Sequence, residues 1–294
     1  MKIGIDGGGT KTECIMIDVR GKVLARHSAP GCNPTVTGPE RAREVLRAAL
    51  RGLAIGQSPP VIARTLLCMA GNRTFWQEAA TALTQEKIYG LVETVDDSLP
   101  VLELATDGGP GLVLHAGTGS FVAARDMAGK VHYAGGLGWR LGDPGSGYEF
   151  GRLAIVHALI ELQGWAPPSR LTKIVRDATQ LADAAAITRF FYQHAEPNQQ
   201  IAALAPAVLQ LAAEGDPAAH RLILDACQPL LTLAQRVVTK LFPNAPPNQL
   251  RTGLSGPILI HPVVIAALAS RSSWPFFAIT DRPIEGVRRI LMKR

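Results

Sequence analysis

Two short glycine-rich stretches hold the residues of this chain that are best suited to bind phosphate. They contain Gly8, Gly9, Thr10 and Lys11 near the N-terminus, and Gly117, Thr118, Gly119 and Ser120 in the middle of the chain. Because glycine has no Cβ, backbone N–H groups in such a turn can converge on an anion. Two such turns facing each other would hold the phosphates of a nucleotide, whereas either turn alone is more often an ordinary hairpin.

Asp6 directly precedes the first glycine-rich turn. A carboxylate beside phosphate-binding N–H groups is explained if a divalent cation bridges the two, because like charges would otherwise repel each other. Asp6 is therefore a candidate metal ligand. A side chain that only caps the turn is the alternative interpretation.

A second pair of carboxylates, Asp96 and Asp97, follows the apolar stretch 91–95. The carboxyl end of a strand in an α/β sheet lies at the edge where ligands usually bind. A carboxylate there could accept the proton of an attacking hydroxyl group during phosphoryl transfer. The same two residues could equally be helix N-caps, so their spacing alone leaves both interpretations open.

Other candidate binding residues stand in turns farther along the chain. Asn33 offers a donor and an acceptor for a polar ligand such as a sugar, and Asp143 could accept hydrogen bonds from vicinal hydroxyl groups. Glycines at 145–147 are expected to leave free N–H groups at a helix N-terminus, which would attract an anion. Ser255 and Gly256 end a strand in small residues that would admit a flat ring. Tight turns explain each of these features as well.

The elements around the first turn alternate between strand and helix. Strands are predicted at 2–6, 13–18, 22–28, 61–69 and 91–95, helices from 39 and over 73–83, and a loop at 56–60. Both glycine-rich turns join two strands, unlike the strand–turn–helix arrangement of a Walker loop. The alternation indicates a mixed sheet with helices packed against it.

From Gly111 the chain repeats this beginning as strand, glycine turn, strand and a third strand at 130–134. Residues 147–242 are rich in alanine and leucine and are predicted to be almost entirely helical, and a last strand is expected at 250–254. We therefore expect one domain at 1–110 and a second at 111–282. The terminal helix, within 283–294, is expected to pack back on the first domain.

Composition narrows the class of protein. The chain has 294 residues, enough for two domains, and its hydrophobic content of 47% indicates well-buried cores. No apolar run approaches the roughly 18 residues of a membrane helix, and no secretory leader is recognisable, so we expect a cytoplasmic protein without a membrane partner. The four cysteines lack metal-binding or disulfide spacing and are expected to be buried thiols: Cys14, Cys32, Cys68 and Cys227.

The formal net charge of +6 raises the question of nucleic-acid binding. The basic residues are spread along the chain and aromatic residues make up only 5%, so no basic surface interleaved with aromatic rings is indicated. We therefore expect no nucleic-acid partner. A positive chain also suits a small anionic substrate such as ATP.

Taken in order, these segments resemble the group that joins N-acetylglucosamine kinases with BadF/BadG/BcrA/BcrD-type ATPases, within the sugar kinase/Hsp70/actin superfamily. The resemblance spans nearly the whole chain and rests on residues 4–12, 33–34, 116–120, 141–148, 205–208, 215–219, 255–256 and 283–286. It implies an α/β fold of two RNase H-like (actin-like ATPase) domains with an interdomain cleft and a helix-rich second domain.

The resemblance also implies cofactors and roles. ATP would bind to both glycine-rich turns and to Ser255 and Gly256, with Mg²⁺ organised by Asp6 through water. Asp97 occupies the place of the catalytic base, and Asn33, Thr118 and Asp143 would hold the sugar. The implied reaction is phosphorylation of an amino sugar at O6, and a homodimer is compatible with the resemblance.

Two residues depart from the family pattern. Leu137 stands where tryptophan is usual and Pro144 replaces a glutamate. Both lie near the expected sugar-binding residues, so N-acetylglucosamine and glucosamine remain alternative acceptors. A BadF-type ATPase that activates a partner enzyme is a second interpretation, although it would need cysteines near the second turn, where the sequence has His115 and Ala116. A non-catalytic sugar- or nucleotide-responsive regulator is a third.

Overall fold

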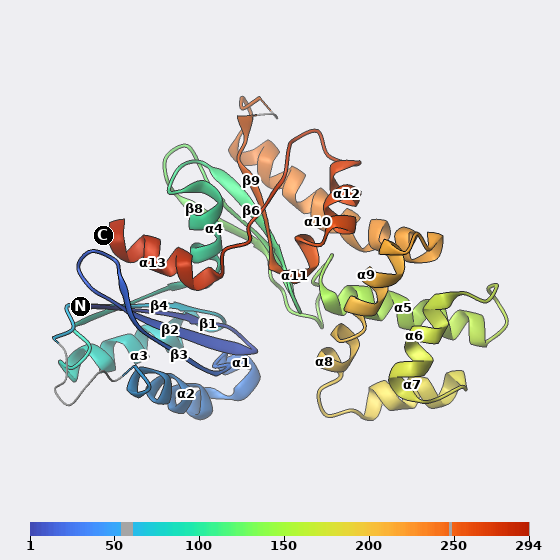
Figure 1. Cartoon of the computed structure of the whole chain (residues 1–294), viewed down its shortest axis with the longest axis horizontal. Helices are drawn as coiled ribbons and strands as arrows, with labels where there is room; N and C mark the ends of the chain where they lie inside the picture. Colours follow the sequence, from blue (N-terminus) through green and yellow to red (C-terminus); the bar gives the residue numbers. More distant parts are fainter. Residues whose placement is uncertain (54–60, 247–248, 294) are drawn as a thin grey trace. The chain divides into compact units, whose positions relative to one another are not determined.

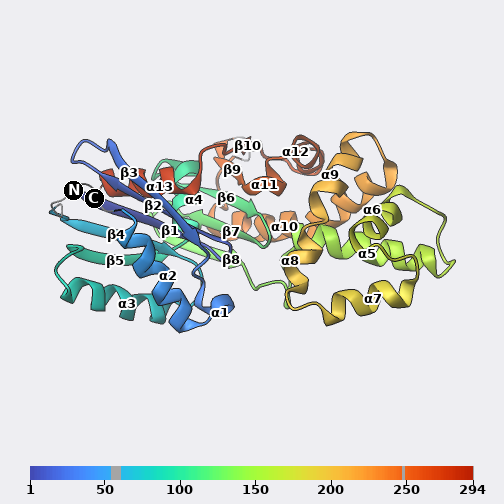
Figure 2. The same ribbon diagram turned by 60° about the horizontal axis from the view of Figure 1, so that its bottom comes forward.

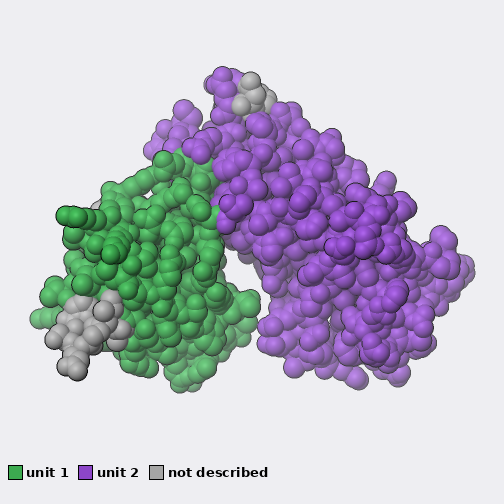
Figure 3. Space-filling view, in the orientation of Figure 1, with its two compact units in different colours: residues 1–107, 281–294 green, residues 108–280 purple. Residues whose placement is uncertain are grey.

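The computed structural model describes residues 1–53, 61–246 and 249–293, which form two compact units. Unit 1 comprises residues 1–107 and 281–294, and unit 2 comprises residues 108–280; Figure 3 shows them in different colours. The loop expected at 56–60 lies outside the described residues.

Unit 1 is built on a five-stranded mixed sheet with the order β3-β2-β1-β4-β5. Its first three strands form an antiparallel meander, and the last two run parallel to β1. The strands are β1 (Lys2–Gly7), β2 (Lys11–Ile17), β3 (Val23–Pro30), β4 (Arg64–Met69) and β5 (Leu91–Asp96). The mixed sheet predicted from the alternation of strand and helix is confirmed, with strand ends that differ by at most a few residues.

Helices cover both faces of this sheet (Figures 1 and 2). Alternate side chains of a strand point to opposite faces, so each strand contributes to two cores. One face packs against α2 (Pro39–Arg51) and α3 (Arg73–Gln85), with Trp76 fully buried. The other face packs against α13 (Pro283–Lys293), the terminal helix, which also contacts α4 (Ser98–Thr106). The short α1 (Pro34–Thr37) follows β3.

Two glycines allow α13 to lie close to its neighbours. A Cβ on Gly286 would lie 2.1 Å from the carbonyl oxygen of Pro100, the third residue of α4. A Cβ on Gly4 of β1 would lie 2.6 Å from Val287. The terminal helix is thus anchored on unit 1 through close backbone approaches.

Unit 2 repeats the strand arrangement of unit 1. Its sheet has the order β10-β9-β6-β7-β8, in which β6, β7 and β8 form an antiparallel meander and β9 and β10 run parallel to β6. The strands are β6 (Gly111–Ala116), β7 (Ser120–Arg125), β8 (Val131–Gly135), β9 (Thr252–Ser255) and β10 (Phe277–Ala278). The repetition noticed in the sequence therefore corresponds to a shared topology. The two-residue β10 was not predicted.

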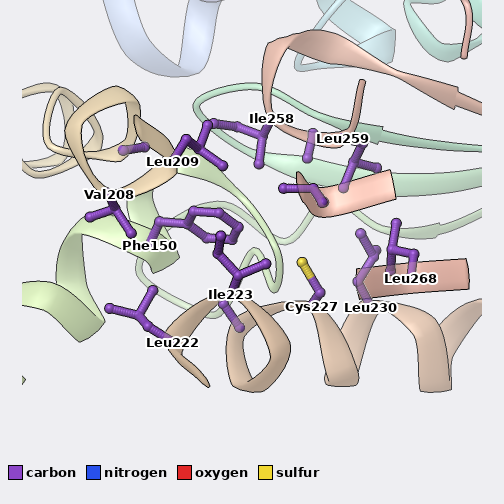
Figure 4. Packing of buried hydrophobic residues seen from close by; sticks show 14 of the residues in the cluster. Phe150, Val208, Leu209, Leu222, Ile223, Cys227, Leu230, Ile258, Leu259 and Leu268 are labelled. Carbon is purple, nitrogen blue, oxygen red and sulfur yellow. The ribbon is translucent and has the colours of Figure 1, made fainter. Parts of the chain in front are cut away.

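The rest of unit 2 is helical. Its helices are α5 (Gly147–Leu162), α6 (Arg170–Thr179), α7 (Ala184–Gln193), α8 (Pro197–Ala202), α9 (Ala205–Ala213), α10 (Pro217–Leu241), α11 (Gly256–Leu259) and α12 (Pro262–Ala269). Figure 4 shows the core between the sheet and the helices, where Phe150 of α5 faces Ile223 of α10 and Val208 of α9. This core fixes the start of α5, which contacts the second glycine-rich turn.

All four cysteines are buried free thiols, as expected. Across the described parts of the chain, no helix combines the length and apolar character needed to span a membrane.

Candidate active site

The first glycine-rich turn is a tight hairpin between β1 and β2. The N–H of Gly8 donates to the carbonyl of Lys11 over 2.9 Å, which puts Gly9 and Thr10 at the exposed tip. The backbone of residue 31 supports the hairpin, because a Cβ on Gly31 would lie 2.1 Å from the Gly9 carbonyl oxygen. A Cβ on Gly9 itself would meet nothing within 4 Å. The tip is therefore supported by the backbone of residue 31, while the space beside the Cα of Gly9 is open to an approaching phosphate group.

The carboxyl ends of three parallel strands bring Asp6 and Asp97 to one edge of the unit 1 sheet. Gly7 of β1, Met69 of β4 and Asp96 of β5 are in register, so the residues beside them share that edge. Burial, followed by the negative charge of Asp97, raises the pKa of Asp6 to about 7. Burial, followed by the charge of Asp96, raises the pKa of Asp97 to about 7. Both carboxyl groups therefore change charge near neutral pH.

The two neighbouring aspartates differ in their contacts. Asp96 accepts a hydrogen bond from the backbone N–H of Ser98 over 2.9 Å, at the beginning of α4. Asp97 occupies the N-cap position of the same helix, but its side chain makes no capping hydrogen bond. The helix-cap interpretation therefore applies to Asp96, whereas the carboxyl group of Asp97 makes no capping hydrogen bond, although the nearby backbone N–H groups of Asp97 and Ser98 lower its pKa against the effect of burial.

Two charged residues that the sequence analysis did not single out lie beside Asp6. Glu13 pairs directly with Asp6 across β1 and β2, and only 11% of its side chain is exposed. One oxygen of Glu13 binds both the ammonium group of Lys11, at 2.7 Å, and the guanidinium group of Arg282. Arg282 also lowers the pKa of Asp6, against the stronger effect of burial. No local signal marks Arg282, because only the fold brings it from the end of the chain to the first hairpin.

Asn33 lies near the end of β4, in the same unit. It is the N-cap of α1, and its side-chain oxygen accepts a hydrogen bond from the N–H of Thr35 over 3.0 Å. A Cβ on Gly71, two residues after β4, would lie 2.3 Å from this oxygen. The oxygen of Asn33 is thus engaged in the turn, and its NH₂ group is the part suited to donate to a ligand.

The second glycine-rich turn, in unit 2, is joined to the start of α5. The N–H of Gly147 donates to the carbonyl of Gly117 over 2.8 Å, and that of Tyr148 donates to Thr118 over 3.4 Å. The side chain of Ser146 accepts from the next N–H group, that of Glu149. The expectation of free N–H groups at residues 145–147 for an anion is therefore wrong for Ser146, whose N–H group donates to the Asp143 carbonyl over 3.2 Å, and for Gly147. The N–H group of Gly147 instead braces the hairpin.

Asp143 lies against this second turn. Its side chain accepts from the N–H of Gly138 over 3.2 Å, and a Cβ on Gly119 would lie 2.8 Å from its other oxygen. Burial raises the pKa of Asp143, while hydrogen bonds from the backbone of Gly138 and Ser120 lower it. Thr118 is exposed at the tip of the turn. The structure therefore places Asp143 against Gly119, the residue next to Thr118, within unit 2.

The two departures from the family pattern lie in the loop between β8 and α5. The side chain of Leu137 is exposed, with a relative exposure of 62%. The carbonyl oxygen of Pro144 accepts a hydrogen bond from the hydroxyl group of Ser120 over 2.7 Å. Pro144 therefore supports the second turn through its backbone, a contact that does not depend on its side chain.

Ser255 and Gly256 lie beside the strand that leads into the second turn. Ser255 pairs with His115 between β9 and β6, and its hydroxyl group lies 3.2 Å from Nδ1 of that histidine. Gly256 has a φ of +85°, and a Cβ on it would lie 2.3 Å from the Ala116 carbonyl oxygen, so only glycine fits there. Burial lowers the pKa of His115 to about 4, which leaves its ring neutral at physiological pH.

The candidate residues therefore form two groups, one in each unit. Unit 1 contributes Asp6, Gly8, Gly9, Thr10, Lys11, Asn33 and Asp97, and unit 2 contributes Gly117, Thr118, Gly119, Ser120, Asp143, Ser255 and Gly256. Within the described ranges, no cluster of three or more histidine, cysteine, aspartate or glutamate residues could enclose a metal ion. One carboxylate such as Asp6 still suits Mg²⁺, which usually keeps several waters and binds substrate phosphates.

Comparison with known proteins finds relatives that match most of this chain. The model of the BadF/BadG/BcrA/BcrD ATPase family matches residues 3–256. The N-acetyl-D-glucosamine kinase of Dictyostelium discoideum is 29% identical over 255 residues, which cover 81% of this chain and 79% of that protein. The N-acetylmuramic acid/N-acetylglucosamine kinase of Clostridium acetobutylicum is 28% identical over 247 residues, with the same coverage of both chains.

The fold also has a counterpart among solved structures. The structure of a candidate N-acetylglucosamine kinase from Porphyromonas gingivalis superimposes with a TM-score of 0.80 at 23% sequence identity. The superposition covers 100% of this chain and 99% of the other. At this identity the similarity concerns the fold.

Proposed function

Because the chain belongs to the BadF/BadG/BcrA/BcrD ATPase family, we propose that it is an ATP-dependent kinase that phosphorylates an amino sugar. The observation that carries the proposal is the arrangement at one sheet edge of unit 1. An open glycine hairpin, a half-buried carboxylate suited to magnesium and the second carboxylate of Asp97 meet there. The names of the two curated relatives support an amino sugar as the acceptor.

In this mechanism, Asp97 accepts the proton of the sugar hydroxyl group, O6 in our proposal, while that oxygen attacks the γ-phosphoryl group of ATP in line. The bond between the γ-phosphorus and the β,γ-bridging oxygen breaks, and ADP leaves. The Asp97 pKa of about 7 suits a base that works at neutral pH. Asn33, Thr118 and Asp143 orient the sugar through hydrogen bonds to its hydroxyl groups.

The two hairpins bind the nucleotide. Backbone N–H groups of Gly8, Gly9 and residues 117–120, with the side chains of Thr10 and Lys11, would hold the phosphates. Ser255 and Gly256 would lie at the adenosine. Asp6 would hold Mg²⁺ through water, and the bound ion would neutralise charge on the phosphates.

N-acetylglucosamine and glucosamine are the two acceptors that we consider. The exposed Leu137 and the loss of a carboxylate at Pro144 change the loop that carries Asp143. Asp143 supplies a carboxyl group that either sugar could use, because both carry vicinal hydroxyl groups. The acceptor therefore has to be found by assay.

ADP release with Mg-ATP should be measured against N-acetylglucosamine, glucosamine, N-acetylmuramic acid and neutral hexoses. We expect at least one amino sugar to stimulate ADP release strongly over the rate without sugar, and the product to carry phosphate on O6. Intact ATP binding without stimulation by any sugar would contradict the proposal and favour an activating ATPase or a regulator.

A further inference from the structure

The cluster of Lys11, Glu13 and Arg282 contains two charges, those of Glu13 and Arg282, that the proposed reaction does not yet use. Glu13 is almost fully buried, whereas the side chains of Lys11 and Arg282 are 54% and 56% exposed. Both cations meet the same carboxylate oxygen, Oε1 of Glu13. One buried negative charge thus holds two positive groups that still face solvent, and the trio has a net charge of +1.

The position of this cluster is set by the strand pairing. Glu13 lies opposite Asp6, and residues paired directly across two antiparallel strands point to the same face of the sheet. Lys11 is the first residue of β2, immediately after the exposed tip at Gly9 and Thr10. The two cations therefore lie beside the hairpin that is proposed to hold phosphate.

Arg282 is held there by the terminal helix. Its carbonyl accepts a hydrogen bond from the N–H of Glu285 in the first turn of α13, over 2.9 Å. The preceding residue, Asp281, forms an ion pair with Arg289 of the same helix at 2.9 Å. Since α13 is anchored on β1 and α4, the backbone of Arg282 is fixed relative to the first hairpin. Its long side chain extends from there to Glu13.

We propose that Arg282 is a further phosphate-binding residue, and that Glu13 is a positioning residue that aims Arg282 and Lys11 at the phosphates held by the first hairpin. A guanidinium group offers five N–H donors in a planar fork. An ion pair with one carboxylate oxygen uses only part of this fork, so donors remain for phosphate oxygens. This inference rests on the proposed function, because it assigns a role toward the phosphates of ATP.

The test measures the affinity of the whole protein for ATP, ADP and adenosine by calorimetry. The variants are Arg282→Ala and Arg282→Lys, with Arg41→Ala as a matched control. Arg41 makes a similar ion pair with Glu44 on α2, and both of those side chains are exposed. The control therefore removes the same charge from the same unit without touching the hairpin.

We expect Arg282→Ala to weaken ATP binding by about tenfold to a hundredfold, the usual effect of losing a charge-assisted hydrogen bond. ADP should be affected less and adenosine not at all. Arg282→Lys should recover part of the loss, since it restores the charge without the fork. A purely structural role of Arg282 would instead leave all three affinities unchanged or weaken all three equally, and either result would overturn the inference.

Glu13 is tested by a double-mutant cycle with Glu13→Gln. If Glu13 acts by aiming Arg282, the glutamine variant also weakens ATP binding, and adding Arg282→Ala to it costs clearly less than in the wild-type background. Full additivity of the two changes would overturn the positioning role. Should Glu13→Gln not fold, the Arg282 series still decides whether that residue binds phosphate.

The failure of this inference is distinguishable from that of the proposed function. Phosphorylation of a sugar by Arg282→Ala with unchanged ATP affinity would overturn the inference alone. An Arg282-dependent affinity for ATP without phosphorylation of any sugar would support the inference and contradict the kinase activity.

Discussion

At the scale of single residues, two adjacent aspartates have separate tasks. Asp96 holds the first turn of α4 through the N–H of Ser98, whereas the carboxyl group of Asp97 makes no capping hydrogen bond. Burial raises the pKa of Asp97 to about 7. A carboxyl group kept half-protonated near neutral pH costs stability, and the proposed catalytic role would explain why such a group is retained.

Asp97→Asn should abolish phosphoryl transfer while ATP binding stays largely unchanged. The amide is nearly isosteric but cannot accept a proton, so we expect kcat to fall by about a hundredfold to ten-thousandfold. Steady-state kinetics and calorimetry with ATP measure the two effects. Asp96→Asn is the control, since it weakens a helix cap but should keep most of the activity. Near-normal turnover of Asp97→Asn would remove this residue from the role of base.

The raised pKa of Asp97 also predicts a pH-dependent stability. Its folded-state pKa of about 7 exceeds the ordinary value of 3.8, so the folded state binds the proton more tightly than the unfolded state. Stability therefore falls as pH rises through this window. Asp97→Asn removes the effect and should be more stable than the wild type near pH 8 by at most about 4 kcal/mol, the full value for a shift of this size.

This gain should shrink toward zero near pH 4, where the wild-type carboxyl group is protonated in the folded state. Urea unfolding of both proteins at the two pH values measures it. An equal difference at both values would mean that Asp97 titrates normally.

At the scale of elements, the sequence was informative wherever local patterns decide the structure. Apolar runs before and after each glycine turn predicted both hairpins, and the apolar spacing in 39–51 predicted α2, all of which the structure contains. The short β10 carries no such pattern, because its two residues gain their strand geometry by pairing with β9. Elements that depend on a partner were therefore missed.

The same limit applies to the candidate site, where local features could be predicted and contacts made by the fold could not. Residues within the two glycine turns could be named from their types, because their chemistry is local. The residues that contact them could not be named from the sequence. In the sequence, Glu13 is typical of a strand residue and Arg282 of a surface charge, and only the fold brings the two into contact. The N–H group of Gly147 is expected to be free at the start of a helix, but in the fold it donates to the carbonyl of Gly117.

Gly286→Ala tests how α13 is anchored. The added methyl group would lie 2.1 Å from the Pro100 carbonyl oxygen, and a backbone atom can move only if α4 moves. We expect a loss of about 1–3 kcal/mol, larger than the gain in helix propensity. Hydrogen exchange should accelerate in β1, α4 and α13 and stay unchanged in unit 2.

Gly9→Ala serves as the control for this substitution, because a Cβ there meets nothing within 4 Å. It should leave stability within about 0.5 kcal/mol of the wild type. Equal exchange rates in Gly286→Ala and the wild type would show that α13 tolerates a wider separation from α4.

At the scale of the whole molecule, the two units share one strand order but differ in what they contribute. The first unit supplies the carboxylates Asp6 and Asp97 and the cations Lys11 and Arg282. The second supplies a hairpin braced by α5, with Asp143 beside it. One topology thus carries charged groups in one copy and mainly backbone and hydroxyl donors in the other.

The chain as a whole carries 30 basic and 24 acidic residues, a net charge of +6. This field should attract ATP, which is anionic, and not a neutral sugar. Raising potassium chloride from about 0.05 to about 0.5 M shortens the Debye length from roughly 14 to 4 Å, so kcat/KM for ATP should fall several-fold.

With magnesium held in constant excess, kcat/KM for N-acetylglucosamine at saturating ATP should change little and provides the internal control. Glucosamine, a cation below its amine pKa, should gain slightly with salt because screening weakens its repulsion. Equal salt dependence for ATP and the neutral sugar would mean that salt acts on the protein generally and not on the encounter with the nucleotide.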